Sequence, residues 1–113
     1  MTECENMIKS ISSGRTLTVY LEGDIDHHNA RPIRSRIDTK VYIQRPDELI
    51  LDLSGVSFMD SSGLGLIMGR FALVRRYGGK LAVADPSAAV LKMMRLAGME
   101  KMIPVKYTKK GRC

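Results

Sequence analysis

The order of strand-like and helix-like segments constrains the fold of this 113-residue chain more than any other feature. Met7, Ile8 and Ile11 suggest a short strand, residues 16–21 are rich in β-forming residues, and the turn at 12–15 predicts a β-hairpin. After the hairpin, apolar spacing predicts a helix, a strand, a helix, a strand and a helix. Because such alternation builds right-handed crossovers, we expect an α/β fold whose mixed, largely parallel sheet has four to five strands with helices packed against it.

The middle of the chain is the most clearly patterned part. Apolar residues are bunched at 48–53, which is typical of a strand covered on both faces. A helical pattern follows from about Ser61 to Arg76 and stops before the Gly78-Gly79 pair, since glycine readily ends helices. A fourth strand is predicted at 80–84.

The C-terminal part predicts a third helix and a short strand. Asp85 is expected to cap this helix, with Pro86 at its first position and Gly98 at its end. Residues 102–107 are expected to add a short edge strand that Pro104 interrupts.

The first helix has an ambiguous start. Residues 22–26 are expected to leave the sheet, and Asp26 can cap a helix. The apolar stripe of that helix consists of Ala30, Ile33, Ile37 and Val41. If Asp26 is the cap, Pro32 lies past the first turn and deletes an internal hydrogen bond. The helix therefore begins later, near Asn29, or is kinked at its start, and the pattern leaves both possibilities open.

Composition indicates one globular domain over residues 1–113, with an aliphatic, Met-rich core because aromatic residues make up only 5%. The chain contains no signal peptide and no apolar stretch of about 18 residues, so we expect it to be soluble and cytoplasmic. Cys4 and Cys113 have no metal-ligand spacing and are expected to be free thiols. Residues 108–113 form a basic tail that is expected to be disordered.

The formal net charge of +6 is spread along the chain rather than gathered in one block. No aromatic residues interleave with the cations as they do in stacking platforms for single-stranded nucleic acid. We therefore expect neither a nucleic acid nor a membrane as a direct partner.

The best candidate for a functional site is the stretch 57–65, where a strand ends and a helix begins. Ser61 has its hydroxyl at the positive end of that helix and follows a carboxylate, Asp60. Such a position can cap the helix, hold an anion or carry a phosphate. The structural alternative is that Asp60, Ser61 and Ser62 only cap the helix.

Enzyme readings of these residues are weak. Ser61 lacks the flanking glycines of a nucleophile elbow. His27 and His28 are adjacent, so on a helix they would point about 100° apart and would not easily share one metal ion.

A nucleotide-binding module is the alternative function. Gly63, Gly65 and Gly69 lie at a strand-to-helix junction, and Asp85 follows at the distance expected of a ribose-binding acid. The third glycine comes one residue too late, however, and the helix is expected to start before the first. Close packing of the helix on the sheet is the simpler role for these glycines.

A phosphate on Ser61 would add roughly −1.5 to −2 charges at neutral pH. A partner carboxylate about 4 Å away would be repelled by roughly 4 kcal/mol per charge pair at an effective dielectric constant of about 20. Binding would weaken by more than about a hundredfold, since each 1.4 kcal/mol is tenfold. Charge alone would therefore suffice to switch an interface here.

Two stretches resemble the STAS-domain anti-sigma factor antagonists, and most closely their sporulation branch. The matching residues are Gly23-Asp24-Ile25-Asp26-His27-His28, the run from Leu51 to Arg70 that contains Phe58-Met59-Asp60-Ser61-Ser62-Gly63-Leu64-Gly65, the pair Gly78-Gly79, and Leu96-Ala97-Gly98. The resemblance extends from about residue 7 to 103. Arg31-Pro32 departs from the usual pattern in the first helix.

The resemblance implies a partner-switching protein that binds an anti-sigma factor serine kinase and so releases a sigma factor. The kinase would use ATP to phosphorylate Ser61, and a serine phosphatase would reverse the reaction. The surface for the kinase would include Asp26, Asp60, Ser61, Ser62, Gly63 and Leu64. This chain would be a substrate and binding protein, not an enzyme, with no cofactor of its own because ATP or ADP is bound by the kinase.

Overall fold

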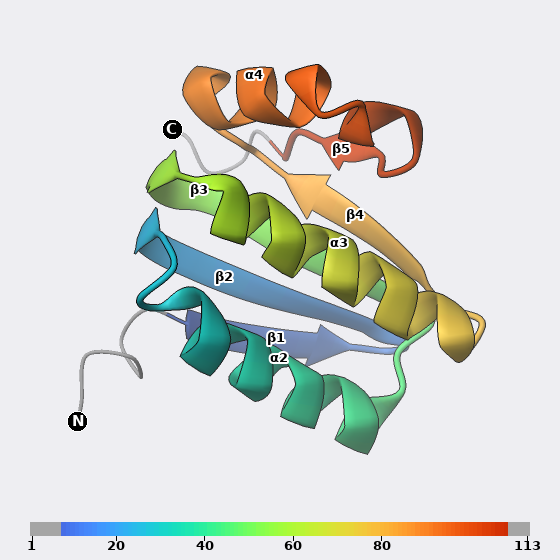
Figure 1. Cartoon of the computed structure of the whole chain (residues 1–113). Helices are drawn as coiled ribbons and strands as arrows, with labels where there is room; N and C mark the ends of the chain where they lie inside the picture. The colour runs from blue at the N-terminus through green and yellow to red at the C-terminus, as the bar shows by residue number, and fades with distance from the viewer. Residues whose placement is uncertain (1–7, 109–113) are drawn as a thin grey trace.

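The computed structural model describes residues 8–108, which form one five-stranded mixed sheet in the order β1-β2-β3-β4-β5. The strands are β1 (Ile8–Ser13), β2 (Thr16–Ile25), β3 (Glu48–Met59), β4 (Lys80–Ala84) and β5 (Val105–Lys106). β1 pairs with β2 in the antiparallel sense, and every other pair is parallel. The predicted hairpin and the predicted largely parallel sheet are both confirmed (Figure 1).

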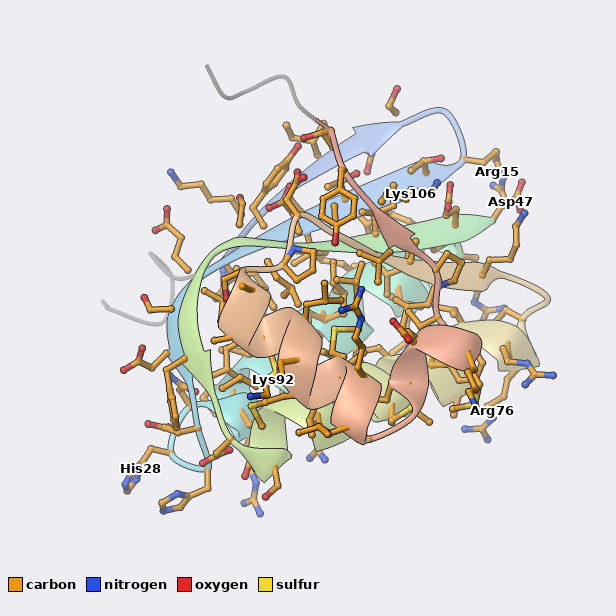
Figure 2. All side chains as sticks on the ribbon, turned by 90° about the horizontal axis from the view of Figure 1, so that it is seen from above. Arg15, His28, Asp47, Arg76, Lys92 and Lys106 are labelled. Atoms are coloured by element: carbon orange, nitrogen blue, oxygen red, sulfur yellow. The ribbon has the colours of Figure 1, made fainter. Side chains whose placement is uncertain are left out.

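Three α-helices lie on the same face of this sheet (Figure 1 and Figure 2). They are α2 (Ala30–Gln44), α3 (Ser61–Arg76) and α4 (Ala88–Leu96), and a short 3-10 turn, η1 (Met99–Lys101), follows α4. The bunched apolar residues of β3 predicted a strand covered on both faces. The described helices cover only one of them. On the opposite face Ile50 is half-buried, and Asp52 is buried with its carboxylate accepting hydrogen bonds from the backbone and hydroxyl of Ser54.

The core lies between the helices and the sheet and is aliphatic, as composition predicted. Alternate residues of each strand point into it, because side chains in a strand alternate between faces. Its fully buried members include Leu17, Val19, Leu21, Leu49, Leu51, Leu53, Ile67, Met94 and Ile103. The predicted stripe of α2 is confirmed: Ile33, Ile37 and Val41 are all buried.

β2 and β3 are both longer than their sequence patterns predicted. β2 continues to Ile25 and β3 to Met59, with register shifts at 20–22 and 23–24, so the expectation that 22–26 leave the sheet is wrong for all but Asp26. Sequence patterning missed these ends because backbone pairing alone holds the polar stretch Glu22-Gly23-Asp24. Ile25 and Met59 consequently end side by side, and the two loops that follow them start together.

α2 begins at Ala30, after Asn29, so the later of the two predicted starts is confirmed. Pro32 is then the third residue of the helix. The first four N–H groups of a helix have no partner within it, so the proline deletes no hydrogen bond there. Asp26 instead caps the turn before the helix: its Oδ1 accepts from the backbone N–H groups of His28 and Asn29 at 2.9 and 3.2 Å.

The start of α4 corrects another expectation. Ser87, not Asp85, caps this helix, and its hydroxyl oxygen accepts a hydrogen bond from Val90 N–H at 3.2 Å. The carboxylate of Asp85 is directed to Thr108 and accepts from its backbone N–H at 3.0 Å and its hydroxyl at 2.6 Å. Asp85 also has a positive φ of 51°, which places it in a turn before the helix.

The C-terminal segment is partly as expected. Gly98 ends α4 with a φ of 75°. Pro104 precedes β5 rather than interrupting it, and its carbonyl accepts a hydrogen bond from Val83 N–H at 3.0 Å. Of the predicted tail 108–113, Thr108 is tied to Asp85, and residues 109–113 lie outside the described part of the chain. No helix within residues 8–108 is long and apolar enough to cross a membrane.

Gly63 permits α3 to lie close to the ends of β2 and β3. A Cβ at this position would overlap Met59 Cγ and would come within 3.3 Å of Ile25 Cγ2, and both side chains are fully buried. We expect Gly63→Ala to lower the free energy of unfolding by about 1–3 kcal/mol, the usual cost of overpacking a core.

Gly69→Ala is the matched control, since a Cβ at Gly69 meets no atom within 4 Å. It should raise the free energy of unfolding by about 0.5–1 kcal/mol through the better helix propensity of alanine. Urea denaturation of both variants tests the pair. Equal stabilities would show that the contact of Gly63 with Met59 does not limit packing.

Candidate partner-binding site at the N-terminus of α3

Asp60 caps α3 and leaves the two serines that follow it free for another role. Its Oδ1 accepts a hydrogen bond from Ser62 N–H at 2.7 Å, and its carbonyl accepts from Gly63 N–H at 3.0 Å. Ser61 is the first residue of the helix and is exposed, whereas Ser62 is half-buried. Neither hydroxyl makes a hydrogen bond to any residue in 8–108. Of these three residues, only Asp60 caps the helix through its side chain, and the Ser61 hydroxyl is accessible.

The loop after β2 lies directly beside this helix start. Asp60 N–H donates to the carbonyl of Ile25 at 3.2 Å, which places Asp26 next to the cap of α3. Asn29 fixes the loop, because its side chain accepts from Asp26 N–H at 2.9 Å and donates to the carbonyl of Asp24 at 2.6 Å. The structure thus brings the predicted residues Asp26 and Asp60 together. The supporting role of Asn29 was not predicted.

The remaining predicted residues contribute differently. Gly63 is buried and acts by letting the helix approach the sheet, and Leu64 is half-buried and packs against the core. An exposed aromatic residue, Phe58, lies at the end of β3, with 53% of its surface accessible. Phe58 was part of the matching run of sequence but was not predicted as a site residue. Phe58 lies three residues before Ser61, near the end of the strand that leads into α3.

A pocket of about 360 Å³ adjoins the site between the first turns of the two helices. This α2–α3 pocket is lined on one side by His27, from the turn before α2, and by Arg31 and Arg34 of α2. On the other side it is lined by Ser62, Gly65 and Leu66 of α3. The sequence indicated only that positive charge is spread along the chain and that Arg31-Pro32 is unusual, although Arg31 and Arg34 are spaced to lie on one face of a helix. That spacing is the signal that could have identified the pocket.

The two alternatives to a binding surface find little support in this geometry. His27 and His28 lie in a turn rather than a helix, so their rings are 4.0 Å apart instead of pointing away from each other. Within residues 8–108, however, no three His, Cys, Asp or Glu side chains are grouped to hold a metal ion. The dinucleotide arrangement is not formed either, because Gly63 packs against Met59 inside the helix and Asp85 holds Thr108.

Comparison with known proteins gives consistent results. Residues 7–111 match the model of the STAS domain family. The chain is 36% identical over 89 residues to the anti-sigma F factor antagonist of Paenibacillus polymyxa, an alignment that covers 79% of this chain and 76% of that protein.

Two solved structures are similar to the whole described fold. The anti-sigma factor antagonist SpoIIAA in its unphosphorylated form has a TM-score of 0.78 and 28% identity, over 91% of this chain and 89% of that one. The Bacillus cell fate determinant SpoIIAA in the phosphorylated form has a TM-score of 0.72 and 27% identity, over 91% and 92%.

Proposed function

Because this chain belongs to the STAS domain family, as one of its anti-sigma factor antagonists, we propose that it binds an anti-sigma factor kinase and that phosphorylation of Ser61 ends this binding. The observation that supports the proposal most is the exposure of Ser61 at the start of α3, with the capping role taken by Asp60. Because this hydroxyl makes no hydrogen bond within the described fold, it is available to accept a phosphoryl group.

In this proposal the kinase supplies the catalytic groups and this chain supplies the acceptor. The γ-phosphoryl group of ATP passes to Ser61 Oγ, the bond between the β- and γ-phosphates breaks, and ADP leaves from the kinase. The proton of the serine hydroxyl passes to a base of the kinase. A serine phosphatase hydrolyses the ester and restores the free hydroxyl, so this chain needs no cofactor of its own and works in the cytoplasm with the transcription machinery.

The proposed binding surface consists of the start of α3 and the loop after β2. Asp26, Asp60, Ser61 and Ser62 provide its polar groups, and Phe58, exposed near the end of β3, is proposed as an additional apolar contact. Gly63 and Leu64 act from beneath the surface by fixing the position of the helix. The similarity to SpoIIAA, of which both an unphosphorylated and a phosphorylated form have been solved, supports this assignment.

Phosphorylation by the anti-sigma factor kinase of the same organism tests the proposal. We expect incubation with kinase and ATP to add one phosphate, which mass spectrometry of tryptic peptides assigns to Ser61. Ser61→Ala should abolish labelling, and Ser62→Ala is the matched control that should keep it. Labelling that persists in Ser61→Ala would contradict the site assignment. Tight binding of nucleotide by this chain alone, measured by calorimetry, would instead favour the nucleotide-binding alternative.

A further inference from the structure

The α2–α3 pocket has an excess of positive charge that no described residue neutralises. Arg31 and Arg34 are both exposed, and neither makes an ion pair or a hydrogen bond to any residue in 8–108. The acid nearest to them along α2, Asp38, is already paired with Arg70 at 2.9 Å. Burial is the main reason why the pKa of Arg70 is lowered, and the charge of Arg34 lowers it further, so Arg34 lies close enough to act on that pair. No acidic side chain of the described residues lines the pocket beside these two cations.

Ser61 is well placed to supply an anion once it is phosphorylated. Ser61 and Gly65 are four residues apart on α3, so they lie on the same face, one turn after the other. Gly65 lines the pocket, and a Cβ built on it would meet no atom within 4 Å. Ser62, the residue directly after Ser61, lines the pocket as well. The surface one turn after Ser61 is therefore open and leads into the pocket that Arg31 and Arg34 line.

The cap of α3 disfavours the other direction for the phosphate. The carboxylate of Asp60 is fixed by its hydrogen bond to Ser62 N–H and carries a negative charge next to Ser61. A phosphate turned toward Asp60 would be repelled, whereas one turned along α3 would meet guanidinium groups. Guanidinium groups bind phosphate through paired hydrogen bonds and remain charged at any physiological pH.

We propose that the α2–α3 pocket binds the phosphate of phosphorylated Ser61, with Arg31 and Arg34 as its counter-ions. This inference rests on the proposed function and adds a regulatory element to it. The phosphate would be held against the protein's own surface instead of projecting freely into solvent. It would then block the binding surface from a fixed position and would be shielded from hydrolysis.

Titration of the phosphate by ³¹P NMR tests the pocket without the kinase. The full chain is prepared with phosphoserine incorporated genetically at position 61. The second pKa of phosphoserine is ordinarily about 6, and cations within about 4–6 Å lower the pKa of an acid by about 1 unit or more. We expect the phosphate pKa to be higher by about 0.5–1 unit in the variant Arg31→Gln/Arg34→Gln than in the unaltered chain.

The variant Arg75→Gln/Arg76→Gln is the matched control, because it removes the same number of charges from the far end of α3. Figure 2 shows Arg76 on the opposite side of the molecule from His28, which lies in the turn before α2. The control should titrate as the unaltered chain does. A phosphate pKa that is the same in all three proteins would overturn the proposal, and so would an equal rise in both variants, which would reflect net charge alone.

Two further measurements separate related explanations. A non-specific alkaline phosphatase should remove the phosphate several-fold faster from Arg31→Gln/Arg34→Gln than from the control, and equal rates would count against the proposal. Inorganic phosphate is added to the unphosphorylated chain in parallel. If it binds near Gly65 while the arginine changes leave the phosphoserine pKa unaltered, the pocket serves a free anion and the assignment to Ser61 is wrong. None of these results depends on binding to an anti-sigma factor, which is tested separately.

Discussion

Replacing Ser61 with aspartate is expected to weaken binding of the anti-sigma factor kinase by about a hundredfold or more and to leave the fold unchanged. Ser61 is exposed, and its hydroxyl makes no hydrogen bond to any other residue of the described range 8–108. A new carboxylate there, about 4 Å from a partner carboxylate, is repelled by roughly 4 kcal/mol at an effective dielectric constant of about 20. A loss of about 2.7 kcal/mol already corresponds to a hundredfold.

Ser61→Asn is the control that separates charge from shape. Asparagine has nearly the same size as aspartate but no charge, so this variant should bind within about tenfold of the unaltered chain, a difference of about 1.4 kcal/mol. Binding is measured by calorimetry or surface plasmon resonance with the kinase in ADP, and folding by the thermal transition. If aspartate and asparagine weaken binding equally, bulk rather than charge disrupts the interface. If Ser61→Asp binds normally, the proposed switch is wrong.

The second large effect concerns the ion pair between α2 and α3. Arg70 is buried, with 8% of its side chain exposed, and its Nε lies 2.9 Å from Oδ1 of Asp38. Burial lowers the pKa of Arg70, and the charge of Asp38 opposes this shift. An arginine guanidinium keeps its charge at neutral pH. Asp38→Ala removes the counter-ion but leaves the buried cation. We therefore expect it to lower the free energy of unfolding by about 3 kcal/mol.

A double variant and an exposed pair complete this test. In Asp38→Ala/Arg70→Met no buried charge remains, so much of the lost stability should return. Glu100→Ala breaks the exposed pair with Arg95, whose atoms are 3.0 Å apart, and should cost less than about 1 kcal/mol. Urea denaturation measures all three. Similar losses for Asp38→Ala and Glu100→Ala would show that the buried pair is no more important than a surface one.

Local patterning was enough to predict the frame of this fold. The helix Ser61–Arg76 was predicted within its observed bounds, since apolar spacing and a glycine pair mark both its face and its end. The stripe of α2 was predicted for similar reasons, and Asp60 was one of three residues considered as the cap of α3. Each of these features depends on residues close together in the sequence, where periodicity and capping preferences apply.

Features that depend on contacts between distant segments were not predicted. The extended ends of β2 and β3 are held by backbone pairing that continues past polar residues, which interrupt the apolar pattern of each strand. The partnership of Asp85 with Thr108 joins residues on two sides of α4 and overrides the ordinary preference of aspartate for capping. The α2–α3 pocket likewise exists only because two helices pack side by side. The roles of Ser61 and its neighbours in partner binding stay predictions.

The bulged ends of β2 and β3 separate the frame of the protein from the recognition surface that we propose. Main-chain hydrogen bonds hold these ends, while Glu22, Asp24 and Phe58 remain exposed on them. Substitutions at such positions change the surface that a partner would contact and leave the packing of the core unchanged. Under the proposed function, paralogues of this domain would differ in partner choice through substitutions in this rim and keep the same architecture.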